Sequence, residues 1–167
     1  ETDAGEDIES DTGVDVPPES PYWQTFATAP LDAETLGSTA TGGVSFRGEL
    51  AAVGVPFAQL DSEESGGAYT LRRTPEGWIQ DALLYPVHND LIVRARFGWS
   101  VAADVDRVAV GVPNNLGRTG GVRLYWNDST SWERTFGLNG DGHEEMGTEA
   151  APAGTTLAVG APESSGG

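Results

Sequence analysis

The sequence predicts an all-β fold: a partial β-propeller of about two and a half four-stranded antiparallel blades, preceded by a disordered acidic N-terminal segment. Three observations predict it. A short motif occurs three times at blade-like spacing, apolar residues alternate between its copies, and Gly, Asn, Asp and Pro separate the alternating segments. No segment has the apolar stripe of a helix. A β-sandwich with accidental repeats is the alternative architecture.

The motif is a tetrapeptide whose copies lie roughly fifty residues apart, as in repeat proteins. The copies are Val53-Gly54-Val55-Pro56, Val110-Gly111-Val112-Pro113 and Val159-Gly160-Ala161-Pro162. Thirteen residues before the second and third copies stand Phe97-Gly98 and Met146-Gly147. Landmarks at a fixed offset indicate that the surroundings repeat as well as the motif.

Further landmarks follow each of the first two copies. Gly66-Gly67 and Gly120-Gly121 precede Trp78 and Trp132 by the same distance. The first copy fits if Leu36-Gly37 opens it. We expect the paired glycines to provide a positive φ where the third strand begins.

Each unit is predicted to contain four short strands, because its residues alternate as half-buried strands require. The predicted faces of the second unit are Trp99, Val101 and Ala103; then Val108, Val110 and Val112; then Val122, Leu124 and Trp126; and finally Trp132 to Leu138. Gly111 and its equivalents are expected to let strands approach closely. The prolines of the motif are expected to end the second strand, because proline has no N–H to donate.

The second unit resembles the bacterial FG-GAP repeat. The resemblance rests on Phe97-Gly98-Trp99-Ser100-Val101-Ala102, Val108-Ala109-Val110-Gly111-Val112-Pro113, Gly121-Val122-Arg123-Leu124-Tyr125 and Trp132. It covers about residues 36–167, and the third unit departs from it at Met146-Gly147. The resemblance implies an integrin-α-like β-propeller that is secreted or on the cell surface and binds other macromolecules.

The expected organisation follows from these landmarks. Residues 1–28 are expected to form a disordered leader and residues 29–167 the blades, with blade 1 at about 36–95, blade 2 at about 96–145 and a partial blade 3 at about 146–167. Since propellers close with several blades, we expect this chain to belong to a longer propeller or to pair with other copies.

Composition limits the partners. The net charge is −17 and all nine basic residues are Arg, which excludes the clustered cations that nucleic-acid binding requires. There is no Cys, so disulfides and thiolate metal sites are excluded. No apolar run could span a membrane. The acidic, Pro-containing stretch from Glu1 to Glu19 predicts a solvated tether, typical of a processed exported protein or lipoprotein.

Calcium is the one metal for which the sequence offers candidates. Asp104-Val105-Asp106-Arg107 lies between the first and second strands, where calcium-binding relatives of this repeat carry their ligands, but Arg107 makes it a poor cage. The equivalent stretches Gly42–Gly48 and Pro152–Gly154 have no carboxylate. Asn139–Glu145 and Asp61–Ser65 are interpreted as solvated loops.

No catalytic set is predicted. His88 and His143 stand in polar turns, and Ser100 lacks the flanking glycine of a nucleophile elbow. Gly111–Thr119 departs from a phosphate loop, and Asn127-Asp128-Ser129 matches a glycosylation sequon. Four tryptophans could stack on sugars but are expected to pack in or between blades, namely Trp78, Trp99, Trp126 and Trp132.

The sequence therefore predicts a non-catalytic, extracytoplasmic protein-interaction or adhesion module with no catalytic, cofactor or metal residues. Its expected partner is a protein or glycan ligand at a surface, and a lipid anchor before processing is compatible with the leader. Two alternatives stay open: a calcium-dependent structural stalk or adhesin, and a carbohydrate-binding or enzyme-associated propeller whose active site lies elsewhere.

Overall fold

The chain folds mostly as antiparallel β-sheet in the residues that the computed structural model describes, 42–60, 65–86, 94–142 and 145–162. The elements are β1 (Val44–Arg47), β2 (Leu50–Val55), β3 (Gly67–Thr74), β4 (Gly77–Leu84), β5 (Val101–Asp104), β6 (Arg107–Gly111), β7 (Gly121–Asn127), β8 (Trp132–Asn139), β9 (Glu149–Ala153) and β10 (Thr156–Gly160). They form two four-stranded sheets and one hairpin. The all-β prediction is confirmed. The predicted leader, with Leu36-Gly37, lies outside the described residues.

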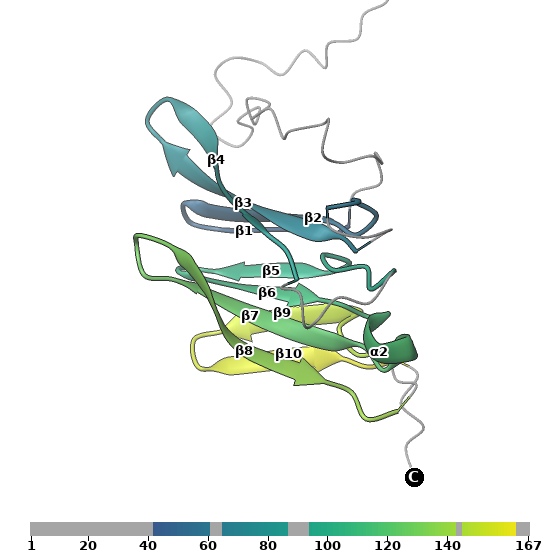
Figure 1. Cartoon of the computed structure of the whole chain (residues 1–167). Helices are drawn as coiled ribbons and strands as arrows, with labels where there is room; N and C mark the ends of the chain where they lie inside the picture. The colour runs from purple at the N-terminus through teal and green to yellow at the C-terminus, as the bar shows by residue number, and fades with distance from the viewer. Residues whose placement is uncertain (1–41, 61–64, 87–93, 143–144, 163–167) are drawn as a thin grey trace, which may run out of the picture.

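Each sheet is a simple meander, in which strands adjacent in sequence are adjacent in space. The orders are β1-β2-β3-β4 and β5-β6-β7-β8, and β9 pairs with β10. Figure 1 shows the sheets stacked face to face, with the hairpin on the far side of the second sheet. Contacts of β5 with both β1 and β9 agree with this layering. The second sheet is therefore packed on both faces.

The main core lies between the two sheets. Leu50 and Ala52 of β2 face Val108 and Val110 of β6, and all four are at most 2% exposed. Val112, just after β6, joins the same core, as the alternation predicted. Each fully buried Val or Leu contributes about 1.5–3 kcal/mol by leaving water. These aliphatic contacts hold the two sheets together.

The third predicted face of the second unit was wrong. Tyr125 enters the core, whereas Leu124 is half-buried on the opposite face and Trp126 is exposed. Tyr125 also meets Phe97 edge-on, with ring centroids 6.1 Å apart. Trp99 was wrongly placed as well, because it precedes β5 and is exposed.

The same backbone bond recurs within each of the three layers, between the glycine before its first strand and the glycine of the repeated motif. The amide of Gly98 donates to the carbonyl of Gly111 at 3.1 Å, and that of Gly147 donates to Gly160 at 2.9 Å. In the first sheet Gly42 donates to Gly54 at 2.8 Å. Gly42 thus occupies the position for which the sequence suggested Gly37.

Glycine is required where two layers come closest. A Cβ on Gly54 would lie 1.8 Å from the carbonyl oxygen of Gly98, and one on Gly111 would lie 1.9 Å from that of Gly147. Gly160 is different, since nothing lies within 3.4 Å of its would-be Cβ. The expected close approach is confirmed at the first two positions and is wrong at the third.

The paired glycines and the prolines behave as predicted. Gly66 and Gly120 have φ of 80° and 75°, in the left-handed region, immediately before β3 and β7. Pro56 directly follows β2, and the equivalent prolines stand two residues beyond β6 and β10. Local rules for Gly and Pro therefore determine where these strands begin and end.

The two ends of the sheets differ. At one end, the turn end, tight turns join β1 to β2, β3 to β4, β5 to β6 and β9 to β10, and a longer turn joins β7 to β8. At the other, the loop end, lie the described parts of the longer connections, 56–60, 65–66, 85–86, 94–100, 112–120, 140–142 and 145–148. The short segment α2 (Asn115–Arg118) lies there and is a turn rather than a regular helix, since its φ values reach 80°.

Candidate functional site

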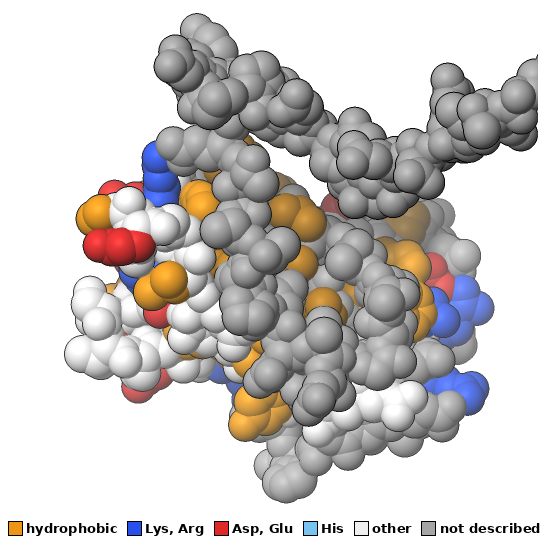
Figure 2. Space-filling view, turned by 90° about the horizontal axis from the view of Figure 1, so that it is seen from above, with side chains coloured by type: hydrophobic (Ala, Val, Ile, Leu, Met, Phe, Trp, Pro, Cys, Tyr) orange, Lys and Arg blue, Asp and Glu red, His pale blue; other side chains and the backbone are white. Residues whose placement is uncertain are grey.

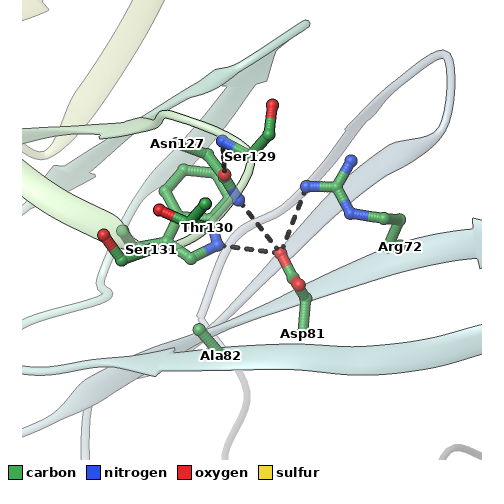
Figure 3. A pocket seen from close by; sticks show the side chains of 8 residues that line it. Arg72, Asp81, Ala82, Asn127, Ser129, Thr130 and Ser131 are labelled. Carbon is green, nitrogen blue, oxygen red and sulfur yellow. Dashed lines mark hydrogen bonds and ion pairs between the residues drawn. The ribbon is translucent and has the colours of Figure 1, made fainter.

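A polar pocket lies at the turn end, between the outer strands of the two sheets. It has a volume of about 320 Å³, and its lining residues are Arg72, Asp81, Ala82, Asn127, Ser129, Thr130, Ser131 and Trp132. The first three come from β3 and β4, and the others from the end of β7, the following turn and the start of β8. Figure 3 shows Arg72 and Asn127 pointing toward the carboxylate of Asp81.

Asp81 binds donors from both sheets through a single oxygen. Its Oδ2 accepts from Trp132 Nε1 at 2.8 Å and from Asn127 Nδ2 at 3.4 Å, both in the second sheet. Arg72 Nη2, from the same sheet as Asp81, lies 3.4 Å from that oxygen. The carboxylate therefore links the outer strands, and the prediction that Trp132 packs between units is supported by this bond.

The turn beside the pocket is ordered by its own side chains. Asp128 Oδ1 accepts from the hydroxyl of Thr130 at 2.6 Å and from the amides of Thr130 and Ser131 at 2.8 and 2.9 Å. These bonds favour the charged form, the Thr130 hydroxyl most, so they lower the pKa of Asp128. Asn127 of the predicted sequon has its amide nitrogen committed to Asp81.

The predicted calcium stretch lies at the turn end, and its carboxylates contact protein donors. Asp104 accepts from Arg47 Nε and from the amide of Gly154, each at 2.9 Å, and its side chain is only 10% exposed. Asp106 accepts from Trp126 Nε1 at 2.8 Å. Asp104 therefore joins the turns of all three layers. Within the described ranges, no three His, Asp or Glu side chains group to hold a metal.

An aromatic–arginine cluster lies at the loop end. We define the Arg96 cluster as Arg96, Phe57 and Trp99. The Arg96 Cζ lies 5.3 Å from the Phe57 ring centroid and 5.5 Å from that of Trp99, and the two rings meet at 69° with centroids 6.2 Å apart. Phe57 follows β2, while Arg96 and Trp99 precede β5, so the cluster joins connections of different sheets.

The remaining candidates have structural contacts or lie outside the described residues. His88, His143 and residues 61–64 lie outside the described residues, whereas Ser65 is described and is fully buried. Ser100 Oγ donates to the carbonyl of Gly147 at 2.9 Å. Within Asn139–Glu145, the first residue accepts from Asn115 and the last pairs with Arg118.

Sequence reasoning missed both Asp81 and Arg96. Asp81 meets Asn127 and Trp132, which are 46 and 51 residues away. Its signal is weak: it is the lone acidic residue of β4, and it is itself exposed. Arg96 precedes the Phe-Gly landmark, and its φ of 58° is unusual for a residue other than glycine.

Comparisons with known proteins do not name a family. No protein-family model matches the sequence, and no curated protein matches it. Among the described residues there is also no helix long and apolar enough to cross a membrane.

Proposed function

We propose that this chain is a non-catalytic interaction module built from FG-GAP-type β-propeller blades, working outside the cytoplasm as part of a longer propeller. The observation that carries the proposal is the recurring junction between layers. The amides of Phe97 and Met146 each donate to a carbonyl of the preceding layer, those of Ser65 and Thr119, and Gly54 and Gly111 make the same close approach to the following layer. A junction of this kind can add layers in one direction, as propeller blades do, and the meander order within each sheet fits blades better than a sandwich.

The polar groups of the described residues support binding rather than catalysis. Asp81 and Asp104 are engaged by donors from neighbouring layers, and the Ser100 hydroxyl is bound to a backbone carbonyl. These side chains stabilise the stack. Both ends expose aromatic and cationic side chains, but those of the loop end stand on the longer connections, and such loops on a rigid scaffold are where recognition concentrates. We therefore assign ligand recognition to the loop end.

Two tryptophans of equal exposure allow a matched test. Trp99, at the loop end, is 38% exposed, and Trp126, at the turn end, is 39% exposed. The purified chain would be applied to arrays of peptides and glycans, and Trp99→Ala and Trp126→Ala would be compared with the wild type. We expect saturable binding that falls about tenfold or more in Trp99→Ala, the range of a binding hot spot, and stays unchanged in Trp126→Ala.

Two results would contradict the proposal. One is an array on which the wild type binds nothing saturably, and the other is chemical conversion of the bound probes. Equal losses in both tryptophan variants would contradict the assignment to the loop end. Melting curves of both variants would be recorded alongside, so that unfolding is not mistaken for lost recognition.

A further inference from the structure

We infer that the Arg96 cluster is a recognition site for a single carboxylate, an Asp or Glu side chain that a protein partner presents beside an apolar residue. The inference deepens the proposed function and rests on it. It starts from the neighbours of the Arg96 guanidinium, which differ from those of four arginines that form ion pairs. Arg47, Arg72, Arg107 and Arg118 each lie against an acidic side chain.

The groups that contact the Arg96 guanidinium are the aromatic rings of Phe57 and Trp99, whereas the four paired arginines contact carboxylates. In the described part of the chain no ion pair or side-chain hydrogen bond engages its guanidinium, and its Nε is buried without an acceptor. Arg96 as a whole is half-buried, and its Nη atoms are not among the buried unpaired atoms. The covered part of the guanidinium is thus its Nε, and the two Nη groups are the part left to contact a ligand.

The rings beside Arg96 make it a stronger carboxylate ligand than an exposed arginine would be. Phe57 and Trp99 stabilise the cation through their ring faces and displace water from its sides. An ion pair formed with the two Nη groups then lies in a lower effective dielectric than bulk water. Two parallel N–H···O bonds fix the orientation of the carboxylate. The site thus has a charge, a geometry and an apolar wall.

The backbone also supports a functional role. Arg94 and Arg96 have φ of 65° and 58°, and residues with side chains rarely adopt such values. Backbone strain of this kind is unfavourable and concentrates at functional sites. Here it places the Arg96 side chain between two sheets, at the end of the stack where the connections are long.

Charge and composition select a protein partner. The net charge of −17 repels a dense polyanion such as a polyuronate, whereas one carboxylate among neutral residues meets the local cation with little opposition. Trp and Arg, with an apolar rim, are also the residues that dominate binding energy at protein interfaces. A third of the Trp99 surface is open to contact an apolar partner residue, since this side chain is 38% exposed.

The test uses immobilised octapeptides carrying one central Asp or Glu among Val, Leu, Tyr and Gly, with Asn and Gln copies of each. The whole chain would be compared with Arg96→Met, Arg96→Lys and Arg73→Met, the last of which removes the same charge at the turn end. We expect the acidic peptides to bind about tenfold or more tightly than their amide copies. Arg96→Met should abolish this preference, Arg96→Lys should weaken it, and Arg73→Met should keep it.

Each other outcome overturns the inference in a recognisable way. Equal binding of acidic and amide peptides, or an unchanged preference in Arg96→Met, removes the carboxylate site while saturable peptide binding leaves the proposed function standing. Tighter binding of galacturonate oligomers than of any acidic peptide would refute the inference that the partner is a protein. Failure of the wild type to bind any probe removes both proposals. Matching melting midpoints of the variants would establish that their folds are intact.

Discussion

Gly111→Ala tests the junction between the second sheet and the hairpin. The new Cβ would lie 1.9 Å from the carbonyl oxygen of Gly147 and 2.2 Å from Ser100 Oγ. The serine side chain can rotate away, but the carbonyl belongs to the backbone of the next layer. Relief therefore requires the layers to separate, and overpacking of this kind costs about 1–3 kcal/mol or more.

Gly160→Ala is the matched control, because it is the same substitution at the same position of the repeated motif. The nearest atom to its Cβ would be Glu149 Cβ at 3.4 Å, an ordinary contact. Alanine is also better than glycine in a strand by about 0.5–1 kcal/mol, so this variant should be neutral or slightly stabilised. The two variants should differ by about 2–4 kcal/mol in free energy of unfolding.

Urea denaturation followed by tryptophan fluorescence would measure this difference, and thermal unfolding would place the midpoints about 10 °C or more apart in a domain of this size. Amide exchange at Met146, whose amide donates to the carbonyl of Thr119 in the preceding layer, would report whether the layers separate locally. Equal stability of Gly111→Ala and Gly160→Ala would refute the claim that close backbone contact holds the layers in register.

Three further predictions concern single side chains. Asp104→Ala should lower the free energy of unfolding by about 1–3 kcal/mol in urea titrations, because Arg47 and the Gly154 amide lose their acceptor; an unchanged midpoint would contradict this. In a carboxyl NMR titration Asp128 should titrate below its ordinary pKa of 3.8, so its contribution to stability is present above that pH and is lost as the pH falls through the lower folded value. Thr130→Val should move the titration upward, and a value that does not move would exclude the hydroxyl as the main cause. Burial raises the pKa of Tyr125 above 10.0, so its stabilising effect holds below pH 10 and is lost at higher pH; Tyr125→Phe should flatten the alkaline limb of the stability profile, and an equally steep limb would contradict this.

The strands were predictable where their pattern depends on residues close together in the sequence. Alternating valines such as Val108 and Val110 identify a buried face, and Pro56 marks a strand end by its missing N–H. Alternation failed at β7 because the second sheet has neighbours on both faces. Leu124 is half-buried while the adjacent Tyr125 lies in the core, so apolar character alone does not identify the deeper residue.

The polar contacts were not predictable, since their partners are remote in sequence. Asp81 is bound by Trp132 from the next sheet, and Arg96 lies over Phe57 from the preceding one. Neither pair is adjacent along a strand or turn, where spacing rules operate. Only the stacking of two complete sheets brings these residues together, and no local pattern encodes that distance.

The junction between layers depends on main-chain atoms, and this has a consequence for how such a chain can change. Phe97 and Met146 hold the same place before a glycine, and both donate their amide to a carbonyl of the preceding layer. The side chain at that position can therefore change while the backbone hydrogen bond between layers is kept. Sequence similarity between the repeats is then lost sooner than their common structure. The same independence makes the unit modular: a duplicate of residues 98–146 inserted after Met146 would bring its own donors, acceptors and glycines, and would lengthen the stack by one layer.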